Sequence, residues 1–492
     1  MDLINLRKEL SNELDRWCHP SLAVAIMREG EILLEEAFGF ADVEQKRKAD
    51  RDTLYQIGSC TKSFTAACIG ILVDRGMVDW DAPIKRYLPW IAFRDKETTE
   101  KATVRDLLCH RTGLPRHDAY WYLGPFTRKE CVENLANMQP LWKLGEHWCY
   151  QNTCYIALGM LIEAVSGMSW ESFVEKELIE PLGMTRTTFY REKMIADSNH
   201  AEPYARFTPK DTTGFSRIPF FTSCVEDMSA GIGTPIGPAG SIMSTLRDME
   251  TWLRFFLNGG VAGTRRIISS ASMEELLSMQ MPMEKPEIYP YPELDRFAYA
   301  MGWFTEYYRG CPIVEHGGYI DGFSALVAMQ PEQKLGFIAL TNLDNSFITY
   351  AFLYQALDAV LGYPEGDWHS RWRKNSEVIF AAPEETDANC EEKNPSYIRE
   401  NYLGTYRNPT YGQAVIGMDE TGLTFLYNTM SSPLRPLSEG RFIISDPKHI
   451  LAGLELKFLS EVEGKTDQFS MDVLLLPGAE PEVFTKENEK CP

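Results

Sequence analysis

The 492-residue sequence has no stretch of about 18 consecutive apolar residues, the length that a membrane-spanning helix requires. Its first 17 residues carry charged side chains every few positions, so they lack the unbroken apolar core of a secretory signal. Its eleven cysteines are odd in number and scattered singly, which fits a reducing cytosol better than a disulfide framework. We therefore expect a cytoplasmic protein without membrane attachment.

Positive charge is scarce in this chain. Lys and Arg number 49 against 70 Asp and Glu, which leaves a formal net charge of −21 at pH 7. A surface of this sign repels phosphate backbones and anionic lipid headgroups. Nucleic acids and membrane surfaces are therefore not expected partners. The length of the chain favours two or more domains.

Several motifs of other enzyme classes are also missing. No G-x-S-x-G occurs, so the nucleophile elbow of an α/β-hydrolase is unsupported. Three glycines have neither the spacing nor the strand–helix context of a dinucleotide fingerprint: Gly231, Gly233 and Gly237. Four side chains near position 150 match no structural zinc pattern and are expected to pack locally: Glu146, His147, Cys149 and Cys154. No metal and no organic cofactor is implied.

The order of the predicted elements favours an α+β fold over regular strand–helix alternation. Two apolar runs, SLAVAIM at 21–27 and EILLEEAFGFA at 31–41, predict an early hairpin. Helical patterns follow, and further strands are predicted at 312–330 and 335–342. The pattern over 346–362 then predicts a closing helix.

The character of the sequence changes after Tyr363. The acidic stretch PEETDANCEEKNP predicts a linker, and the tail carries short apolar runs about every 8 to 12 residues with turn signals between them. This spacing is typical of a small β-barrel or sandwich. We predict one domain over 1–365, a linker over 366–395 and a β domain over 396–492.

The stretch GSCTK at 58–62 allows three interpretations. Ser59 and Lys62 stand three positions apart, so on a helix the amine can lie beside the hydroxyl. A serine hydroxyl is a weak nucleophile until a nearby base takes its proton, and a buried lysine can be that base. Alternatively Ser59 only caps the helix, or Cys60 is the reactive atom. Cys60 has no local histidine and would point about 100° away from Ser59.

Two further motifs carry the functional prediction. Tyr150 and Asn152 form a Y-x-N just before a predicted helix. His316 begins an H-G-G that enters a predicted strand, and its paired glycines, Gly317 and Gly318, permit a ligand to approach the backbone closely. A phenol, an amide and an imidazole could thus join the serine and the lysine.

Neither of the first two motifs decides anything alone. The tail contains a second S-x-x-K at Ser445 and Lys448, and a second Y-x-N at Tyr406 and Asn408. Pro447 argues against a helix at the second S-x-x-K. Only the order of all three motifs along the chain is informative.

In this order, S-x-x-K, Y-x-N and H-G-G resemble the motifs of the serine β-lactamase and penicillin-binding-protein superfamily, and within it the class C-like branch of serine hydrolases and D-amino-acid peptidases. The flanks follow that branch as well: IGSCTKSFTAACIGILVDRGMVDWDAPIKRYLP, TVRDLLCHRTGLP, CYIALGMLIEAVSG, PLGMTRT and GPAGSIMSTLRDMETWLRFFLNGG. The resemblance spans residues 10–362 approximately. The tail, with YLGTYRNPTYGQAVIG, resembles the lipocalin-like barrel attached to some of these peptidases.

The resemblance implies a fold. It is an antiparallel β-lactamase/transpeptidase-like sheet flanked by helices, with a helical subdomain and a small C-terminal antiparallel β-barrel. It also implies roles. Ser59 would be the acylated nucleophile and Lys62 its activating partner, while Tyr150 would act as a base and then pass the proton to the leaving group. Asn152 would orient the substrate and Lys62. Which of Lys62 and Tyr150 is the base in acylation stays open.

The same resemblance assigns the late strand to substrate binding. The backbone N–H groups of Ser59 and Tyr319 would form the oxyanion hole, beside Gly317 and Gly318. His316 stands where penicillin-targeted enzymes have a lysine, and a histidine there is expected to titrate near neutrality. We therefore expect weaker docking of a substrate carboxylate and a preference for peptides, amides or esters.

These inferences predict a serine hydrolase that forms an acyl-enzyme on small molecules or short peptides, including peptides that contain D-amino acids. The alternatives are an esterase, a β-lactamase or an acyltransferase of the same superfamily. A further alternative is a catalytically inactive ligand-binding protein whose barrel carries the function. The barrel is expected either to restrict access to the cleft or to build a homo-oligomer.

Other polar and aromatic residues near the motifs allow a structural interpretation. His110 and His117 flank a Gly-Leu-Pro turn and are expected to be loop histidines with satisfied hydrogen bonds. Four tryptophans could line an apolar pocket or pack in the core, with equal support for each: Trp121, Trp142, Trp148 and Trp303.

Overall fold

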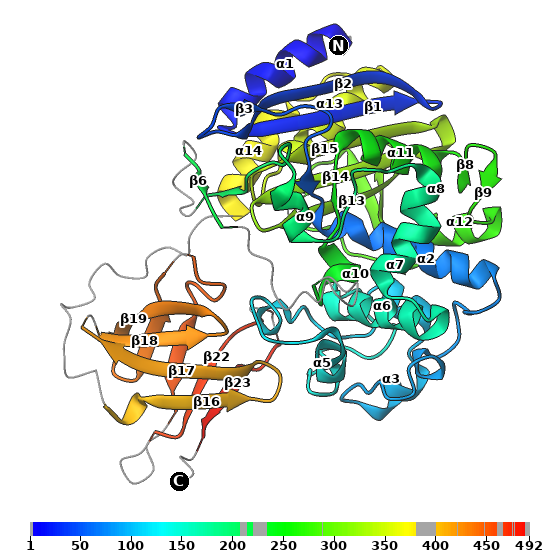
Figure 1. The fold of residues 1–492 in the computed structure, drawn as a ribbon. Helices are drawn as coiled ribbons and strands as arrows, with labels where there is room; N and C mark the ends of the chain where they lie inside the picture. The colour runs from blue at the N-terminus through cyan, green and yellow to red at the C-terminus, as the bar shows by residue number, and fades with distance from the viewer. Residues whose placement is uncertain are drawn as a thin grey trace.

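The computed structural model describes residues 3–206, 214–219, 234–287, 289–379, 400–420, 422–446, 448–459, 466–474, 476 and 478–487. Gly231 and Gly233, and the part of the predicted linker from 380 onward, lie outside these residues. The described chain forms a large sheet-and-helix unit with an eight-stranded barrel beside it (Figure 1). The predicted α+β fold class is confirmed.

A nine-stranded antiparallel sheet lies at the centre of the large unit. The N-terminal hairpin is inserted beside the late strands, because Ala23 of β1 pairs with Leu340 of β15. In sheet order the strands are β10 Met281–Pro282, β11 Leu294–Tyr299, β12 Phe304–Tyr308, β13 Cys311–Ile320, β14 Phe323–Gln330, β15 Leu335–Thr341, β1 Ser21–Arg28, β2 Glu31–Asp42 and β3 Arg47–Lys48. Strands β14 and β15 are buried along their whole length, and their sequences, FSALVAMQ and LGFIALT, are accordingly mostly apolar.

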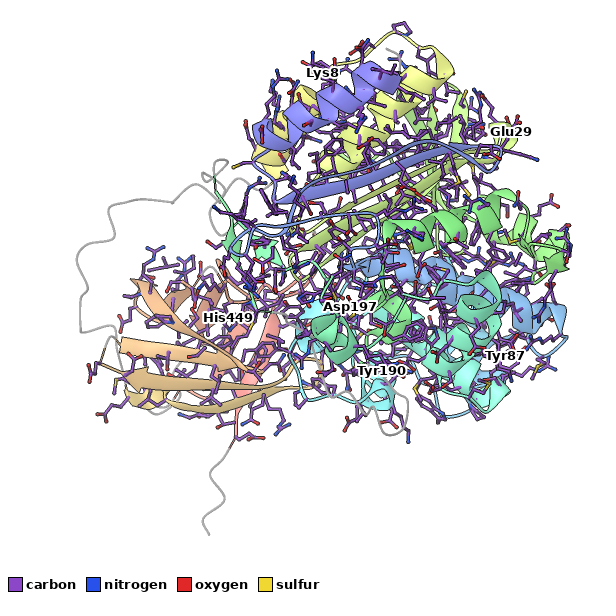
Figure 2. The ribbon with its side chains drawn as sticks, turned by 45° about the horizontal axis from the view of Figure 1, so that its top comes forward. Lys8, Glu29, Tyr87, Tyr190, Asp197 and His449 are labelled. Carbon is purple, nitrogen blue, oxygen red and sulfur yellow. The ribbon has the colours of Figure 1, made fainter. Side chains whose placement is uncertain are left out.

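One face of the sheet is covered by three helices from the two ends of the unit: α1 Leu3–Arg16, α13 Ile348–Leu361 and α14 Trp368–Ile379. Leu6, Leu10 and Leu14 of α1 are buried at helical spacing. Figure 2 shows Lys8 on the opposite, exposed side of this helix. The amphipathic pattern therefore docks α1 on the sheet.

The other face carries the remaining helices and short strands. The helices are α2 Thr61–Asp74, α3 Lys96–Lys101, α4 Val104–Leu108, α5 Arg128–Glu133, α6 Asn152–Ser166, α7 Trp170–Val174, α8 Glu180–Leu182, α9 Arg191–Ala196, α10 Gly237–Gly240, α11 Leu246–Leu257 and α12 Ser270–Leu277. Three short strand pairs accompany them: β4 Tyr55–Gln56 with β7 Met243–Ser244, β5 Tyr204–Ala205 with β6 Ser216–Arg217, and β8 Val261–Ala262 with β9 Arg265–Arg266. Helix α6 ends at Gly167, which adopts the left-handed conformation (φ 72°).

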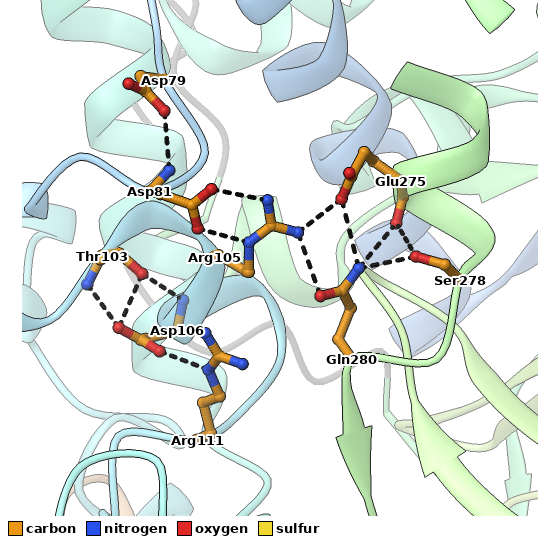
Figure 3. Close-up of polar contacts among 9 residues, drawn as sticks. All are labelled: Asp79, Asp81, Thr103, Arg105, Asp106, Arg111, Glu275, Ser278 and Gln280. Carbon is orange, nitrogen blue, oxygen red and sulfur yellow. Dashed lines mark hydrogen bonds and ion pairs between the residues drawn. The ribbon is translucent and has the colours of Figure 1, made fainter. Parts of the chain in front are cut away.

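A half-buried arginine links helix α4 to two other segments of this unit. Arg105 of α4 contacts Asp81 (Nε to Oδ1, 2.7 Å) and Glu275 of α12 (Nη1 to Oε2, 2.6 Å), as Figure 3 shows. Helix α4 itself begins with a reciprocal capping box between Thr103 and Asp106. These contacts fix the position of α4, the helix that directly precedes the loop after residue 110.

Helix α14 lies in the segment that the sequence analysis places in the linker. Its Trp368 and Trp372 are at most 1% exposed and belong to the core beneath the sheet. Trp372 stacks on Phe347 and Tyr350, with ring centroids 5.2 and 5.4 Å apart. The start of the predicted linker is thus a packed helix, while the division into 1–365, 366–395 and 396–492 stays a prediction.

We expect Trp372→Ala to lower the free energy of unfolding by about 3 to 5 kcal/mol, because a large buried ring leaves a cavity. Urea unfolding followed by circular dichroism measures this loss. Trp90, which is 38% exposed, is the matched control, and Trp90→Ala should cost less than about 1 kcal/mol. Equal small losses in both variants would contradict the packing of α14 in this core.

The C-terminal unit is a closed antiparallel barrel. Its strands are β16 Gly404–Asn408, β17 Gly412–Asp419, β18 Gly422–Tyr427, β19 Met430–Ser438, β20 Arg441–Ile444, β21 Glu455–Phe458, β22 Gln468–Met471 and β23 Glu482–Lys486. Pairing of Tyr406 with Lys486 closes the circle. The interior is filled by rings that are fully buried: Tyr406, Phe425, Tyr427, Phe442, Phe469 and Phe484. The predicted C-terminal barrel is confirmed.

In the part of the chain that is described, no single helix is both long enough and apolar enough to cross a membrane. Helix α6 and the segment Trp170–Leu182 meet both criteria only when taken together, and they are bent by 74° at their junction.

Candidate active site

Ser59 lies in a short 3₁₀ turn, Gly58–Cys60, that leads into α2. Gly58 has a φ of +49°, a conformation that favours glycine. Strand β13 packs directly against this turn. A Cβ atom built on Gly318 would lie only 1.9 Å from the Ile57 carbonyl oxygen and 3.0 Å from the Ser59 nitrogen. Only glycine at 318 allows the strand to lie this close to the serine backbone.

Two side chains converge on the Ser59 hydroxyl. Lys62 Nζ lies 3.1 Å from Ser59 Oγ, and the Tyr150 hydroxyl donates to the same oxygen at 2.8 Å. Lys62 is fully buried and also donates to the Ala239 carbonyl at 2.7 Å. Burial and then the positive charge of Arg116 hold the pKa of Lys62 well below its usual range. A neutral amine beside a serine hydroxyl can accept its proton.

The pKa of Tyr150 is shifted in the opposite direction to that of Lys62. Burial raises the pKa of Tyr150, and Arg116, whose guanidinium carbon lies 5.2 Å from the centre of the phenol ring, partly opposes that rise. The phenol is therefore protonated at pH 7 and acts as a donor to Ser59. Of the two groups beside Ser59, the lysine is the one whose pKa is shifted toward the form that can accept a proton.

Asn152, the first residue of α6, contacts an acidic side chain that the sequence analysis did not single out. Its amide nitrogen donates to Asp118 Oδ1 at 2.9 Å. Asp118 is also paired with Arg116 and accepts from Trp121 Nε1 at 3.0 Å. Lys62 donates instead to a backbone carbonyl. Orientation of Lys62 by Asn152 therefore stays a prediction, while orientation of Asn152 by Asp118 is observed.

His316 is buried, with 1% of its surface exposed. Its Nδ1 lies 2.7 Å from the Gly317 carbonyl oxygen and its Nε2 lies 3.0 Å from the Tyr299 hydroxyl. Nδ1 therefore donates to the carbonyl and Nε2 accepts from the phenol. Burial, followed by the charge of Lys62, lowers the pKa of His316 to about 3. The expectation that this position titrates near neutrality is wrong, because burial keeps the imidazole neutral.

Ser59, Tyr150 and Asn152 line a cavity of about 620 Å³ beside one edge of β13. Strand β12 pairs with β13 only as far as Glu315, and His316, Gly317, Tyr319 and Ile320 line the cavity beyond that point. Gly318, predicted to bind substrate, packs against the turn of Ser59 instead. Ten aromatic side chains contribute to the lining: Trp121, Tyr122, Trp148, Tyr150, Tyr289, Phe297, Phe304, Tyr319, Phe347 and Tyr350. The cavity is therefore broad, mostly apolar and open to an extended chain.

The charged groups of the lining are mainly acidic. Arg116 is the cation among the described lining residues, whereas five carboxyl groups take part: Asp118, Glu306, Glu315, Asp321 and Asp344. Burial raises the pKa of Glu306 to about 7 and that of Asp321 to about 8. The Tyr122 hydroxyl donates to Asp321 Oδ1 at 2.6 Å. Except for Asp118, these pKa shifts favour the neutral form of the carboxyl groups, so the lining offers hydrogen-bonding groups rather than strong negative charge.

We expect Arg116→Gln to move the acid limb of the kcat/KM profile to higher pH. The guanidinium lowers the pKa of Lys62, so its removal raises that pKa and the free base appears only at higher pH. Because the Arg116 side chain is 59% exposed, the shift should shrink at 1 M salt. Arg94→Gln, on an exposed side chain that donates to the Asn137 carbonyl, is the control. An acid limb that did not move would contradict this coupling.

The two alternatives for GSCTK are resolved by the local geometry. Cys60 is buried, its thiol donates to the His316 carbonyl at 3.1 Å, and burial raises its pKa. It is a core residue. Helix α2 has Cys60 at its N-cap position and no side-chain cap, so the expectation that Ser59 caps the helix is wrong. Its hydroxyl is held by Lys62 and Tyr150 instead.

The second copies of the motifs lie in the barrel and do not assemble. Ser445 Oγ donates to the Pro433 carbonyl at 2.9 Å, and Lys448 lies beyond it on the same loop. Tyr406 is fully buried inside the barrel, and its hydroxyl donates to the Tyr402 carbonyl at 2.9 Å. The order of the motifs, rather than their number, identified the constellation.

Comparison with known proteins agrees with this constellation. The sequence model of the family described as Beta-lactamase matches residues 10–359, which is most of the chain. The chain belongs to the β-lactamase family. It is a serine hydrolase of that family, as the predicted resemblance implied.

Two relatives illustrate the breadth of the β-lactamase family. The chain is 27% identical over 399 residues to the unguisins hydrolase ungD of Aspergillus violaceofuscus, which covers 76% of this chain and 68% of the relative. It is 25% identical over 352 residues to protein flp of Staphylococcus aureus, which covers 69% of this chain and 63% of that protein.

Two solved structures share the fold of this β-lactamase-family chain. The octameric penicillin-binding protein homologue from Pyrococcus abyssi has a TM-score of 0.63 at 22% identity, over 99% of this chain and all of that one. The D-amino acid amidase from Ochrobactrum anthropi SV3, complexed with D-phenylalanine, has a TM-score of 0.57 at 23% identity, over 73% of this chain and 99% of the other.

In this β-lactamase-family chain, sequence reasoning missed the loop residues Arg116 and Asp118. They flank His117 in the stretch PRHD, so the signal lay beside a residue already considered. His117 Nδ1 contacts the Tyr411 hydroxyl of the barrel at 2.8 Å, and His110 Nδ1 accepts from the Gln151 backbone at 3.1 Å. Each histidine thus makes a loop contact through Nδ1, but Nε2 of each is buried without a hydrogen-bond partner among the described residues, so the expectation that their hydrogen bonds are satisfied is wrong for that nitrogen.

The four tryptophans have different surroundings. Trp121 and Trp148 line the cavity, whereas Trp303 is buried in the core and the Trp142 ring contacts that of His147 at a tilt of 37°. The four side chains near position 150 make unrelated local contacts. Examples are Glu146 Oε2 with the Lys143 backbone at 3.0 Å, and Cys154 with Thr112 at 3.8 Å.

Proposed function

We propose that the protein hydrolyses amide bonds of small substrates, including short peptides and D-amino acid derivatives, through an acyl-enzyme at Ser59. The observation that carries this proposal is the contact of Ser59 Oγ with both Lys62 Nζ and the Tyr150 hydroxyl, at 3.1 and 2.8 Å. A hydroxyl flanked by a neutral amine and a phenol has both a proton acceptor and a proton donor.

In the acylation step, Ser59 Oγ attacks the substrate carbonyl carbon while its proton moves to the Lys62 amine. The carbonyl oxygen becomes an oxyanion, and the backbone N–H groups of Ser59 and Tyr319 would stabilise it. The C–N bond then breaks. Tyr150 donates its proton to the leaving nitrogen and regains one from Lys62, so the proton count balances.

Deacylation uses the same groups with water in place of the leaving amine. Water attacks the ester carbonyl of the acyl-enzyme, gives a proton to the Lys62–Tyr150 pair, and releases Ser59 with its hydroxyl restored. Asn152, held by Asp118, would hydrogen-bond the substrate beside the scissile bond.

The substrate class follows from the cavity. The open edge of β13 can pair with an extended backbone, and the aromatic lining suits apolar or aromatic side chains. The neutral His316 removes the fixed cation with which related enzymes would dock a carboxylate. A D-amino acid amidase among the structural relatives supports amides of D-amino acids as the first substrates to test.

The proposal is tested on the wild-type protein with a fluorophosphonate and a substrate panel. Peptide mapping by mass spectrometry should place the phosphonate adduct on Ser59. The panel contains D- and L-aminoacyl amides, p-nitrophenyl esters and a chromogenic cephalosporin. We expect kcat/KM for at least one amide to exceed that for the cephalosporin about tenfold or more, the effect of one missing charge-assisted hydrogen bond.

The outcomes separate the alternatives. An adduct on another residue would refute Ser59 as the nucleophile, and preferred turnover of the cephalosporin would assign a β-lactamase instead. Hydrolysis confined to esters would make the protein an esterase. A cytoplasmic location, the homo-oligomeric state and the role of the barrel in limiting access stay predictions.

A further inference from the structure

One wall of the cavity is a single loop between α4 and α5. Four of its residues line the cavity: Arg116, Asp118, Trp121 and Tyr122. Three of them contact the rest of the site. Arg116 lies over the Tyr150 ring, Asp118 accepts from Asn152, and Tyr122 donates to Asp321. The position of this pocket-wall loop, residues 116–122, therefore sets several groups around Ser59.

The far side of the pocket-wall loop is held by the barrel. Asn428 lies in the turn between β18 and β19, and its amide nitrogen lies 2.8 Å from the Tyr122 carbonyl oxygen. The same nitrogen lies 3.4 Å from the carbonyl oxygens of both Ala119 and Tyr120. One barrel side chain thus contacts three backbone carbonyls of the pocket-wall loop.

A second barrel turn holds the start of the loop. The Tyr411 hydroxyl lies 2.8 Å from His117 Nδ1, and both side chains are 1% exposed. Tyr411 is itself held by the Tyr427 hydroxyl, which donates to its carbonyl at 2.9 Å. Next to it, the Thr410 carbonyl accepts from Asn134 Nδ2 at 2.7 Å. The pocket-wall loop is therefore held by barrel residues on one side and by residues of the cavity on the other.

The barrel also reaches the cavity directly. Ile450 is 38% exposed and belongs to the lining. Its neighbour His449, marked in Figure 2, fixes that loop through contacts with the Met430 carbonyl at 3.2 Å and with the Leu451 backbone at 3.1 Å. The barrel and the pocket-wall loop therefore both contribute residues to the lining of the cavity.

We propose that Asn428 and Tyr411 are positioning residues of the hydrolase: through them the barrel sets the pocket-wall loop, and with it the Asp118–Asn152 pair that faces the substrate. The inference rests on the proposed function, because it assigns to the barrel a share in substrate orientation at Ser59. It makes the barrel part of the active enzyme rather than a separate module.

The decisive variant is Asn428→Gly in the full-length chain. Asn428 has a φ of +52°, so glycine keeps the turn and removes only the side chain. We expect kcat/KM for the best amide substrate to fall about tenfold, as for loss of one or two buried hydrogen bonds. Reaction of Ser59 with a small fluorophosphonate, which does not fill the pocket wall, should slow less than about threefold.

The matched control is Gln468→Ala, an exposed amide whose bond to Thr485 at 3.1 Å stays within the barrel. It should leave both rates unchanged. Thermal unfolding of each variant checks that the barrel is still folded. Tyr411→Phe, which removes only the hydroxyl that contacts His117, should lower amide turnover in the same selective way.

A double-variant cycle tests whether the effect passes through the loop. If Asn428 acts by placing Asp118, then Asn428→Gly should have little further effect in an Asp118→Asn background. Independent, multiplying losses would overturn the inference, and so would an Asn428→Gly variant within twofold of wild type. Absence of a Ser59 adduct in the wild-type protein would instead refute the proposed function itself.

Discussion

Ser59→Ala is expected to reduce amide hydrolysis by at least about 10⁴-fold and to abolish labelling by a fluorophosphonate. Without Oγ no acyl-enzyme can form, and the remaining donors can only orient water. Lys62 and Tyr150 would keep their places, since both contact other groups as well: Lys62 donates to Ala239, and Tyr150 packs against His110 with ring centroids 4.3 Å apart. The loss should appear in kcat, measured in single-turnover experiments.

Two variants serve as controls for this result. Cys60→Ala removes the adjacent thiol, which contacts the His316 carbonyl rather than the cavity, and should retain labelling. Ser445→Ala removes the serine of the second S-x-x-K and should behave as wild type. Undiminished labelling of Ser59→Ala would show that another residue is the nucleophile.

Lys62→Met is expected to slow acylation about 10³-fold, the usual worth of a general base. Methionine is close to lysine in length and fits a fully buried site without a charge, so a loss of folding is not expected. Because the amine is the group that titrates on the acid side, the residual rate should also lose its acid limb. Stopped-flow measurement of the acylation burst across pH tests both statements.

Lys448→Met on the barrel is the matched control and should keep the wild-type burst rate. Tyr150→Phe gives the complementary information. If Tyr150→Phe lost about 10³-fold while Lys62→Met stayed within threefold of wild type, then the phenol rather than the amine would be the base. Comparable losses in both variants would support a relay in which each group handles the proton once.

Much of this site could be predicted because the motifs lie on elements that a sequence pattern can identify. Ser59 and Lys62 are three residues apart at a helix start, and the glycines after His316 indicate a strand that contacts another backbone. The convergence of Ser59, Lys62 and Tyr150 follows from the resemblance, since no local pattern places a loop tyrosine beside a serine 91 residues earlier.

The rest depends on tertiary packing. Burial decided the charge state of His316, and the sequence around it gives no measure of burial. Arg116 and Asp118 lie in a loop whose course is set by contacts with the barrel, so their positions follow from no periodicity. Trp368 and Trp372 did carry a local signal, because two tryptophans four positions apart indicate one buried helix face. The acidic segment next to them concealed it.

The pairing of β1 with β15 has a consequence for synthesis of the chain. The hairpin of β1 and β2 leaves the ribosome first, yet β1 cannot complete its place in the sheet until Leu340 has been made. The turn that carries Ser59 is likewise translated long before the strand with Gly318 that packs against it. Contacts between residues so distant in sequence form slowly. The edge of β1 that pairs with β15 therefore stays open until β15 has emerged.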